Sequence, residues 1–318
     1  MSHVRHDFKT VYHIGNTTLM DELESNLKTW LDWGFLRIGA WFDVEYPTEG
    51  GYGGDFSILR RVDDPAFTAG TVWESARKDW VWEIDVDYVG LDTNTHNPKV
   101  VANTVLVNTT PTAYSWIDYP LGRVHFSSPI SLTAVVAADY SYRWVQVYKA
   151  TTSQWWKELQ YRSFRVDDAF FSQLDGGSWS IGGQHRIQMP TVVIEAVPRS
   201  TSRPYQLGDG SAWVNQDIIC HVLAETASDR NKIVDILRGQ FDSSLILFNS
   251  NSISTAEDWP LDYKGMIVDS GQTYPMLVDD HPWTQCRISR TEISEVDALN
   301  SRLYEGRVRL TCEVVLND

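Results

Sequence analysis

Residues 214–248 hold the pattern that most constrains the fold, because two hydrophobic periods meet there within one short stretch. Every second residue of 218–224 is apolar, which is typical of a strand with one buried face. A helix is predicted to begin at Ser228, whose hydroxyl would accept from the free amides of the first turn. Residues 244–248 then form an apolar run of strand length. The order strand, helix, strand predicts a helix that packs one face on a sheet.

This predicted helix has an apolar face and a charged face. We expect it to end at Gly239 or at residues 242–243. The apolar face carries Ile233, Ile236, Leu237 and Phe241. The charged face carries Arg230, Lys232, Asp235 and Arg238. Such a face is ordinarily solvated, but mixed charges also fix the register of neighbouring subunits in a ring, so these four side chains are the candidate subunit interface.

A second helix is predicted over residues 18–33, with Thr18 as N-cap and Gly34 just past its C-terminus. A weaker helical pattern covers residues 153–164. Closing strands are predicted at 284–293 and 303–316, since apolar residues alternate there. The apolar face of the second helix is formed by Leu19, Leu23, Leu27, Trp30 and Leu31.

Residues 72–148 contain short alternating runs separated by turn residues, which predicts a small β sandwich or barrel. In the clearest run, residues 80–88, apolar side chains alternate with Glu83, Asp85 and Asp87. We therefore expect a half-buried antiparallel strand with these carboxylates in water. Further strands are predicted at 100–108, 122–126 and 132–148. The 14 Trp and 14 Tyr residues also favour β structure, because aromatic side chains suit a pleated surface.

Together these patterns predict an α+β protein with three regions. Residues 1–71 hold the N-terminal helix and strands and are expected to pack on the C-terminal domain. Residues 72–150 form the β-rich domain. Residues 151–318 form a mixed sheet with one packed helix. The four glycines of EGGYGGDF, residues 49–56, predict a flexible loop.

The chain is acidic, with a net charge of −15 and a pI of about 4.9. This excludes tight binding to nucleic-acid phosphates, which depends on Lys and Arg. Acidity suits a surface past which DNA slides, although it also serves simple solubility. Cys220, Cys286 and Cys312 lie in apolar, strand-like contexts and are expected to be reduced, buried thiols. No apolar run has the length of a membrane span.

Two features of the sequence are candidate metal sites. Residues 279–281, Asp-Asp-His, with Cys286 nearby supply metal-ligand types, but the prolines around them favour an exposed acidic turn. His221 has no second His or Cys at ligand spacing, so it is predicted to be a sheet residue. The common hydrolase, phosphate-loop and dinucleotide motifs are absent from the sequence. We therefore predict no enzyme activity, no metal and no cofactor.

A glycosidase is the remaining enzymatic alternative. Glu83 and Asp85 would supply its carboxylates, and Trp80 and Trp82 its sugar platform. Retaining glycosidases place two carboxyl groups about 5.5 Å apart, whereas same-face strand neighbours lie roughly 7 Å apart. A carbohydrate-binding module is favoured over a glycosidase, because exposed aromatic rings alone would suffice.

The phrase HVLAETASDRNKIVDIL at residues 221–237, with the YQLG turn at 205–208, resembles the C-terminal half of virion structural proteins of tailed bacteriophages. In those proteins a strand ending in HVxAE leads into a DRNxLVDI helix, with a YxLG turn upstream. The resemblance covers residues 190–248. The nearest class is the neck or head-to-tail connector group, including tail-terminator-like proteins. The long Trp-rich segment ahead of this region departs from smaller tail terminators.

The resemblance implies a non-enzymatic virion component that is assembled in the host cytoplasm. Copies would form a ring around the DNA channel and contact neighbouring connector or adaptor, tail-tube or sheath proteins. DNA would pass through without specific binding, and no membrane is involved. The alternative is a tail or baseplate carbohydrate-binding protein that uses exposed Trp of residues 72–148.

Overall fold

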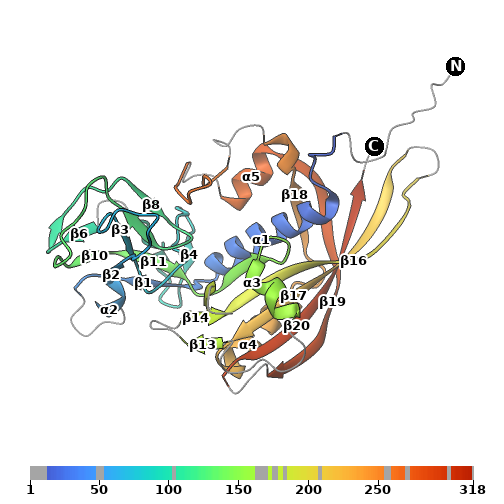
Figure 1. Ribbon diagram of the computed structural model, residues 1–318. Helices are drawn as coiled ribbons and strands as arrows, with labels where there is room; N and C mark the ends of the chain where they lie inside the picture. The colour runs from blue at the N-terminus through green and yellow to red at the C-terminus, as the bar shows by residue number, and fades with distance from the viewer. Residues whose placement is uncertain are drawn as a thin grey trace.

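The computed structural model describes residues 13–47, 54–101, 105–161, 171–173, 178–181, 185–206, 210–253, 259–268, 273–298 and 302–316. They form an α+β protein, as predicted, in which a six-stranded sheet with packed helices stands beside a smaller β-rich body (Figure 1). The glycine-rich loop predicted at 49–56 lies largely outside the described residues.

The larger sheet has the order β12-β16-β17-β20-β19-β18 and is mixed. Only the β12–β16 pair is parallel, and the other pairs are antiparallel. The strands are β12 (Gln146–Lys149), β16 (Thr191–Pro204), β17 (Ala212–Ala224), β18 (Ser244–Phe248), β19 (Pro282–Ala298) and β20 (Tyr304–Leu316). The predicted strands at 244–248, 284–293 and 303–316 are therefore confirmed.

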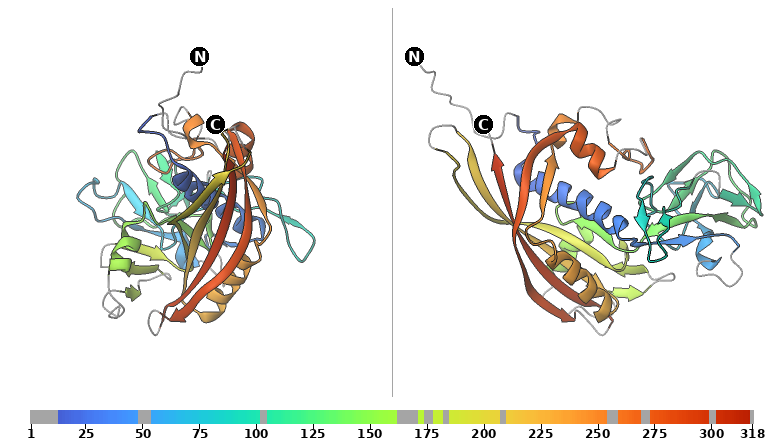
Figure 2. Two further views of the ribbon diagram at one scale, coloured as in Figure 1. Left: turned by 90° about the vertical axis from the view of Figure 1, so that its right-hand side faces the viewer. Right: turned by 180° about the vertical axis from the view of Figure 1, so that it is seen from behind.

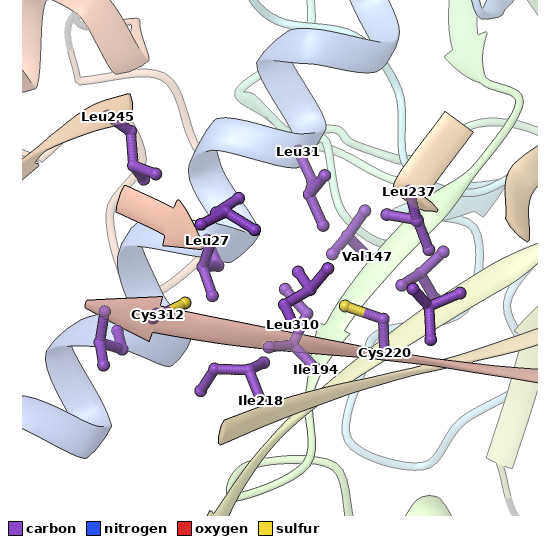
Figure 3. Packing of buried hydrophobic residues seen from close by; sticks show 14 of the residues in the cluster. Leu27, Leu31, Val147, Ile194, Ile218, Cys220, Leu237, Leu245, Leu310 and Cys312 are labelled. Atoms are coloured by element: carbon purple, nitrogen blue, oxygen red, sulfur yellow. The ribbon is translucent and has the colours of Figure 1, made fainter. Parts of the chain in front are cut away.

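Helices α1 (Leu19–Arg37) and α4 (Ala227–Arg238) cover one face of this sheet. Their apolar stripes meet the inward side chains of all six strands in one cluster, part of which Figure 3 shows. The three cysteines are free and buried here, as predicted. Helix α4 packs tightly on β20, since a Cβ on Gly306 would come within 2.7 Å of the Val234 side chain. A larger residue at position 306 would force that side chain to move.

Helix α3 (Gln154–Tyr161) packs on the opposite face, which confirms a helix in the predicted 153–164 region. Trp155, Trp156 and Leu159 contact Val193 and Leu223 there. Helix α5 (Tyr274–Asp280) packs against β18 and α1. The remaining elements beside this sheet are η2 (Ser250–Ser252) and a three-stranded sheet of β13 (Phe171–Gln173), β14 (Ser178–Ile181) and β15 (His185–Gln188).

The β-rich body is built on a seven-stranded antiparallel sheet of order β7-β6-β10-β2-β3-β9-β8. Its strands are β2 (Ile58–Arg61), β3 (Val72–Glu74), β6 (Val105–Val107), β7 (Thr110–Pro111), β8 (Trp116–Asp118), β9 (Arg123–His125) and β10 (Val136–Ala138). Beside it lie the β1 (Trp41–Val44) and β11 (Tyr140–Arg143) pair, the β4 (Tyr88–Val89) and β5 (Thr95–His96) pair, and α2 (Gly54–Ser57). Trp80 stacks on Tyr140 in its core, with ring centroids 4.2 Å apart.

The β-rich body is inserted between α1 and β12. The Trp144 amide donates to the Ala40 carbonyl at 2.9 Å, and β1 pairs with β11, so the chain leaves and re-enters the larger body at one place. The sheets thus divide the chain differently from the predicted boundaries at 71/72 and 150/151. β2 belongs to the seven-stranded sheet and β12 to the six-stranded one, whereas α1 packs on the C-terminal sheet as expected.

Both predicted helices differ from the structure at one end. Helix α1 continues through Gly34 to Arg37, because Phe35 and Leu36 are buried on its inner side. The turn that ends it contains Gly39, which has a φ of 77°. Thr18 is the N-cap residue, as expected.

The N-cap of α4 is Thr226 and not Ser228. The Thr226 hydroxyl accepts from the Asp229 amide at 3.0 Å. Gly239 ends the helix, which is one of its two predicted ends, so Phe241 lies beyond it and is exposed. Val234 takes its place on the buried face.

The predicted strand over residues 80–88 is wrong. Tyr88 and Val89 pair with β5 and Trp80 makes a single bridge to Tyr142, but the residues between them form no strand, because Asp85 and Asp87 have φ values of 57° and 52°. Positive φ interrupts the pleat, so the alternation in the sequence does not become alternation in space. The other predicted strand regions are confirmed as shorter strands, with residues 132–148 divided among β10, β11 and β12.

Replacement of Thr226 by Ala is expected to destabilise the protein by about 1 kcal/mol, because the α4 amide would lose its only side-chain cap. The matched change is Ser228→Ala. Ser228 lies two residues later and is exposed, so its replacement is expected to have little effect. Urea unfolding of both variants measures the difference. Equal losses would contradict the assignment of Thr226 as the cap.

Candidate functional site

The four charged residues predicted as a subunit interface lie together along α4. Arg238 and Asp235 form an exposed ion pair at 2.9 Å. The Lys232 ammonium lies 4.8 Å from the Trp144 ring, and the Arg230 guanidinium 5.6 Å from the Tyr304 ring. Exposed pairs of this kind contribute little to stability. The structure therefore supplies a mixed-charge surface here.

The sheet face opposite α1 and α4 is polar, and α3 covers only part of it. The side chains on this open face surround a shallow hollow of about 450 Å³. They are Arg199, Thr201, Asn215, Asp217, Ser289, Arg290, Glu292, Arg309, Thr311 and Glu313. Side chains of opposite charge lie on neighbouring strands, since Arg309 pairs in register with Glu292. The Thr311 hydroxyl also donates to the Asp217 carboxylate at 3.0 Å. The open face is therefore a broad mixed-charge surface.

The outer half of the β16–β17 hairpin projects from the sheet as an arm (Figure 2). β12 pairs with β16 only as far as Ile194. From Pro198 to Pro204 every residue is exposed, and this edge of β16 pairs with no further strand among the described residues. We call residues 198–206 and 210–216 the arm.

The arm carries an aromatic and arginine cluster that the sequence analysis did not single out. The Arg203 guanidinium lies 5.0 Å from the Trp213 ring, and Tyr205 stacks on Trp213 with centroids 5.9 Å apart. The Trp213 indole donates to Asn215 at 3.0 Å, which fixes its orientation. Tyr205 is 48% exposed. Trp, Tyr and Arg are the residue types that dominate binding energy at protein interfaces.

The acidic residues predicted to share one strand face do not lie together. Glu83 is buried and forms an ion pair with Arg143, which is equally buried. Arg143 also donates to the Trp80 carbonyl at 3.2 Å and lies 3.5 Å from Asp79. Asp85 is exposed. Glu83 is therefore engaged in a buried ion pair whereas Asp85 faces solvent, so the two carboxylates do not share one environment.

Trp80 and Trp82 do not form an exposed sugar platform. Trp80 is fully buried in the core of the β-rich body, and Trp82 is 9% exposed. Trp73 is buried as well, and Trp116 stacks on His125 with centroids 3.5 Å apart. Trp73, Trp80 and Trp82 therefore present no exposed ring on which a sugar could pack.

His221 lies in the sheet, as predicted, and has two acidic neighbours that the sequence did not indicate. Its Nε2 lies 2.8 Å from Glu195, and its Nδ1 lies 3.5 Å from Glu305. Burial alone lowers the pKa of His221, but the two carboxylates outweigh burial and raise it. The Trp156 ring packs against the imidazole at 4.5 Å. This arrangement joins β16, β17 and β20 under α3.

The candidate metal segment at residues 279–281 is exposed at both aspartates, as predicted, but it ends a helix instead of forming a loop. Asp279 and Asp280 end α5, and His281 Nδ1 lies 3.1 Å from the Ser252 hydroxyl. Cys286 is buried in β19, on the face covered by α1. Across the described residues, no group of three His, Cys, Asp or Glu side chains is placed to hold a metal ion.

The sequence matches no protein-family model and no curated protein. Among the described residues, no helix combines the length and the apolar composition that crossing a membrane requires.

Replacement of Glu83 by Gln is expected to destabilise the protein by about 3 kcal/mol, because the buried Arg143 guanidinium would lose its closest carboxylate. Asp85→Asn is the matched control, since Asp85 is exposed and Asn tolerates a positive φ. Its effect should stay within about 0.5 kcal/mol. Chemical denaturation compares the two, and equal effects would refute the buried pair.

The stability of the protein should also depend on the ionisation of Asp79. Burial raises the pKa of Asp79 from 3.8 to about 6, although Arg143 opposes this rise. The folded protein therefore binds this proton more tightly than the unfolded chain. Relative to Asp79→Asn, the wild-type free energy of unfolding should fall by about 1–3 kcal/mol as the pH rises from about 4 to 7. Parallel pH curves for the two proteins would contradict this assignment.

Proposed function

We propose that this chain is a non-enzymatic virion structural protein whose copies assemble into a ring, of the neck, head-to-tail connector or tail-terminator type. The resemblance of residues 190–248 to phage connector proteins supports the class. The observation that carries the proposal is the arm, because every residue of its first strand, from Pro198 to Pro204, is exposed on either face within that same region. A monomer gains nothing from this exposure, whereas a neighbouring subunit would bury it.

The arm and the open face are suited to a contact between successive copies. A closed ring with head-to-tail contacts requires two different surfaces on each chain, each of which binds the complementary surface of a neighbouring copy. The arm offers Arg203 and the Trp213 ring, and the open face of the next copy offers Glu292 and Glu313 among its charges. Opposite charges would set the register, and the aromatic cluster would supply most of the affinity.

The charged face of α4 lies on the other side of the sheet from the open face. In the proposed ring it is the second candidate contact, against a neighbouring subunit or another virion protein of the connector, tail-tube or sheath kind. Exposed charges such as Lys232 and Arg238 change association rate and salt dependence more than affinity. Its contribution can therefore be separated from that of the arm.

The acidic balance of the chain suits a channel through which DNA passes. A net charge of −15 disfavours the release of counterions that drives protein binding to phosphates. In the proposed ring, DNA would slide through without specific contacts. The protein would act in the virion after assembly in the host cytoplasm.

The wild-type protein is expected to form closed rings of one copy number in native mass spectrometry and negative-stain electron microscopy. Trp213→Ala combined with Arg203→Ala should leave monomers, because each lost hot spot weakens a contact roughly thirtyfold. Tyr263→Ala is the matched control, since Tyr263 is 92% exposed and lies outside the arm and the open face. Lys232→Glu with Arg238→Glu should keep the ring but change its salt dependence.

Two results would overturn the proposal. A wild-type protein that stays monomeric at all concentrations up to about 100 μM would lack the affinity that a stable interface requires. Rings that form equally well without the arm cluster would refute the arm as the contact and leave α4 to be tested alone.

A further inference from the structure

A pocket of about 440 Å³ lies where α1, the β-rich body and the segment at residues 259–261 meet. We call it the α1 pocket. Aromatic and apolar walls come from five different parts of the chain. They include Trp82, Tyr148, Phe248, Trp259, Pro260 and Leu277. Its volume lies within the range of about 300–1,000 Å³ that is typical of small-molecule sites.

The charges that line the α1 pocket balance within the protein. Three are basic and three acidic, namely Lys28, Arg143 and Lys149 with Asp32, Asp79 and Glu83. Lys28 and Asp32 form an ion pair at 2.7 Å, and Arg143 pairs with Glu83. A charged ligand would have to break one of these pairs or add an uncompensated charge to a partly desolvated site. A neutral ligand meets neither cost.

Two buried polar atoms of the lining lack a hydrogen-bond partner among the described residues. Asp32 Oδ1 is an acceptor, and Arg143 Nε is a donor. Their residues are 9% and 4% exposed. An unsatisfied buried polar group costs about 1–3 kcal/mol, so native proteins rarely leave such atoms without a ligand or water. Both residues line the α1 pocket.

We propose that the α1 pocket binds a neutral polyhydroxylated ligand, of roughly one or two sugar rings. A hydroxyl group both donates and accepts, so adjacent hydroxyls satisfy Asp32 Oδ1 and Arg143 Nε without altering the charge balance. The C–H face of a sugar ring packs on the aromatic rings of the wall. Trp259 is only partly buried, so its ring is available for this contact. This site is a pocket between several elements, unlike the exposed Trp platform of the carbohydrate-binding alternative.

The proposal is independent of ring assembly. The lining of the α1 pocket shares no residue with the arm or with the open face. Arm variants should therefore keep sugar binding, and pocket variants should keep the ring. The failure of one proposal is thus distinguishable from the failure of the other.

The test is saturation-transfer NMR and titration calorimetry of the full chain with defined neutral sugars. The probes are glucose, galactose, N-acetylglucosamine and their β-linked disaccharides, with glucose 6-phosphate and sialic acid as charged counterparts. At least one neutral probe should bind, and the charged counterparts should bind about tenfold more weakly or not at all.

Trp259→Ala and Asp32→Ala should each weaken that binding about tenfold or more. Tyr263→Ala is the matched control, since it removes an exposed aromatic ring four residues from Trp259 and outside the pocket lining. Near-ultraviolet circular dichroism checks that each variant is folded. Trp259→Ala alters no ion pair, so it keeps the test decisive even where Asp32→Ala unfolds. No binding by any neutral probe, tighter binding of the charged sugars, or binding unchanged in Trp259→Ala would overturn the proposal.

Discussion

The architecture depends on the burial of the leucine stripe of α1 against a sheet whose strands all follow residue 145. Helix α1 precedes that sheet in the chain, so the segment between α1 and β12 must leave the larger body after α1 and re-enter it before β12. The Ala40–Trp144 hydrogen bond and the β1–β11 ladder bring the two crossings together. The β-rich body is therefore an insertion with adjacent ends, an arrangement that domains tolerate well because the ends of an independent fold lie close together.

The ion pair of Arg143 and Glu83 stands at this junction. Arg143 is the last residue of β11, and Glu83 comes from the irregular segment 60 residues earlier. A buried pair contributes little net stability, because the desolvation of both charges offsets their attraction. The Arg143–Glu83 pair nevertheless restricts how the β-rich body packs against α1. If the β-rich body moved, one of these buried charges would lose its partner. The α1 pocket lies at the same junction, so its shape depends on this restriction.

The elements that could be predicted from the sequence are those whose pattern is local. The stripe of α1, the β17-α4-β18 unit and the alternation of β20 each follow from neighbouring residues, and the structure contains them. Thr226 and Ser228 are equally good caps by residue type, and only the point where β17 leaves the sheet selects Thr226. The run at residues 80–88 alternates like a strand but turns at Asp85 and Asp87. The partner of Glu83, the pocket and the arm depend on contacts distant in sequence, which no local pattern encodes.

The arm has an edge that is protected against unspecific pairing. An exposed strand edge is a template for any other strand, and natural proteins block it with prolines and charged residues. Pro198 and Pro204 stand at the two ends of the exposed part of β16, and Arg199 and Arg203 stand next to them. Backbone addition of a foreign strand is thereby disfavoured along the edge. Any specific contact of the arm must then be made by side chains, and the stacked Arg203, Trp213 and Tyr205 are already held in one geometry before a partner arrives. Less conformational entropy is lost on binding from such a surface, which is why a rigid cluster of a few residues can determine how neighbouring subunits associate.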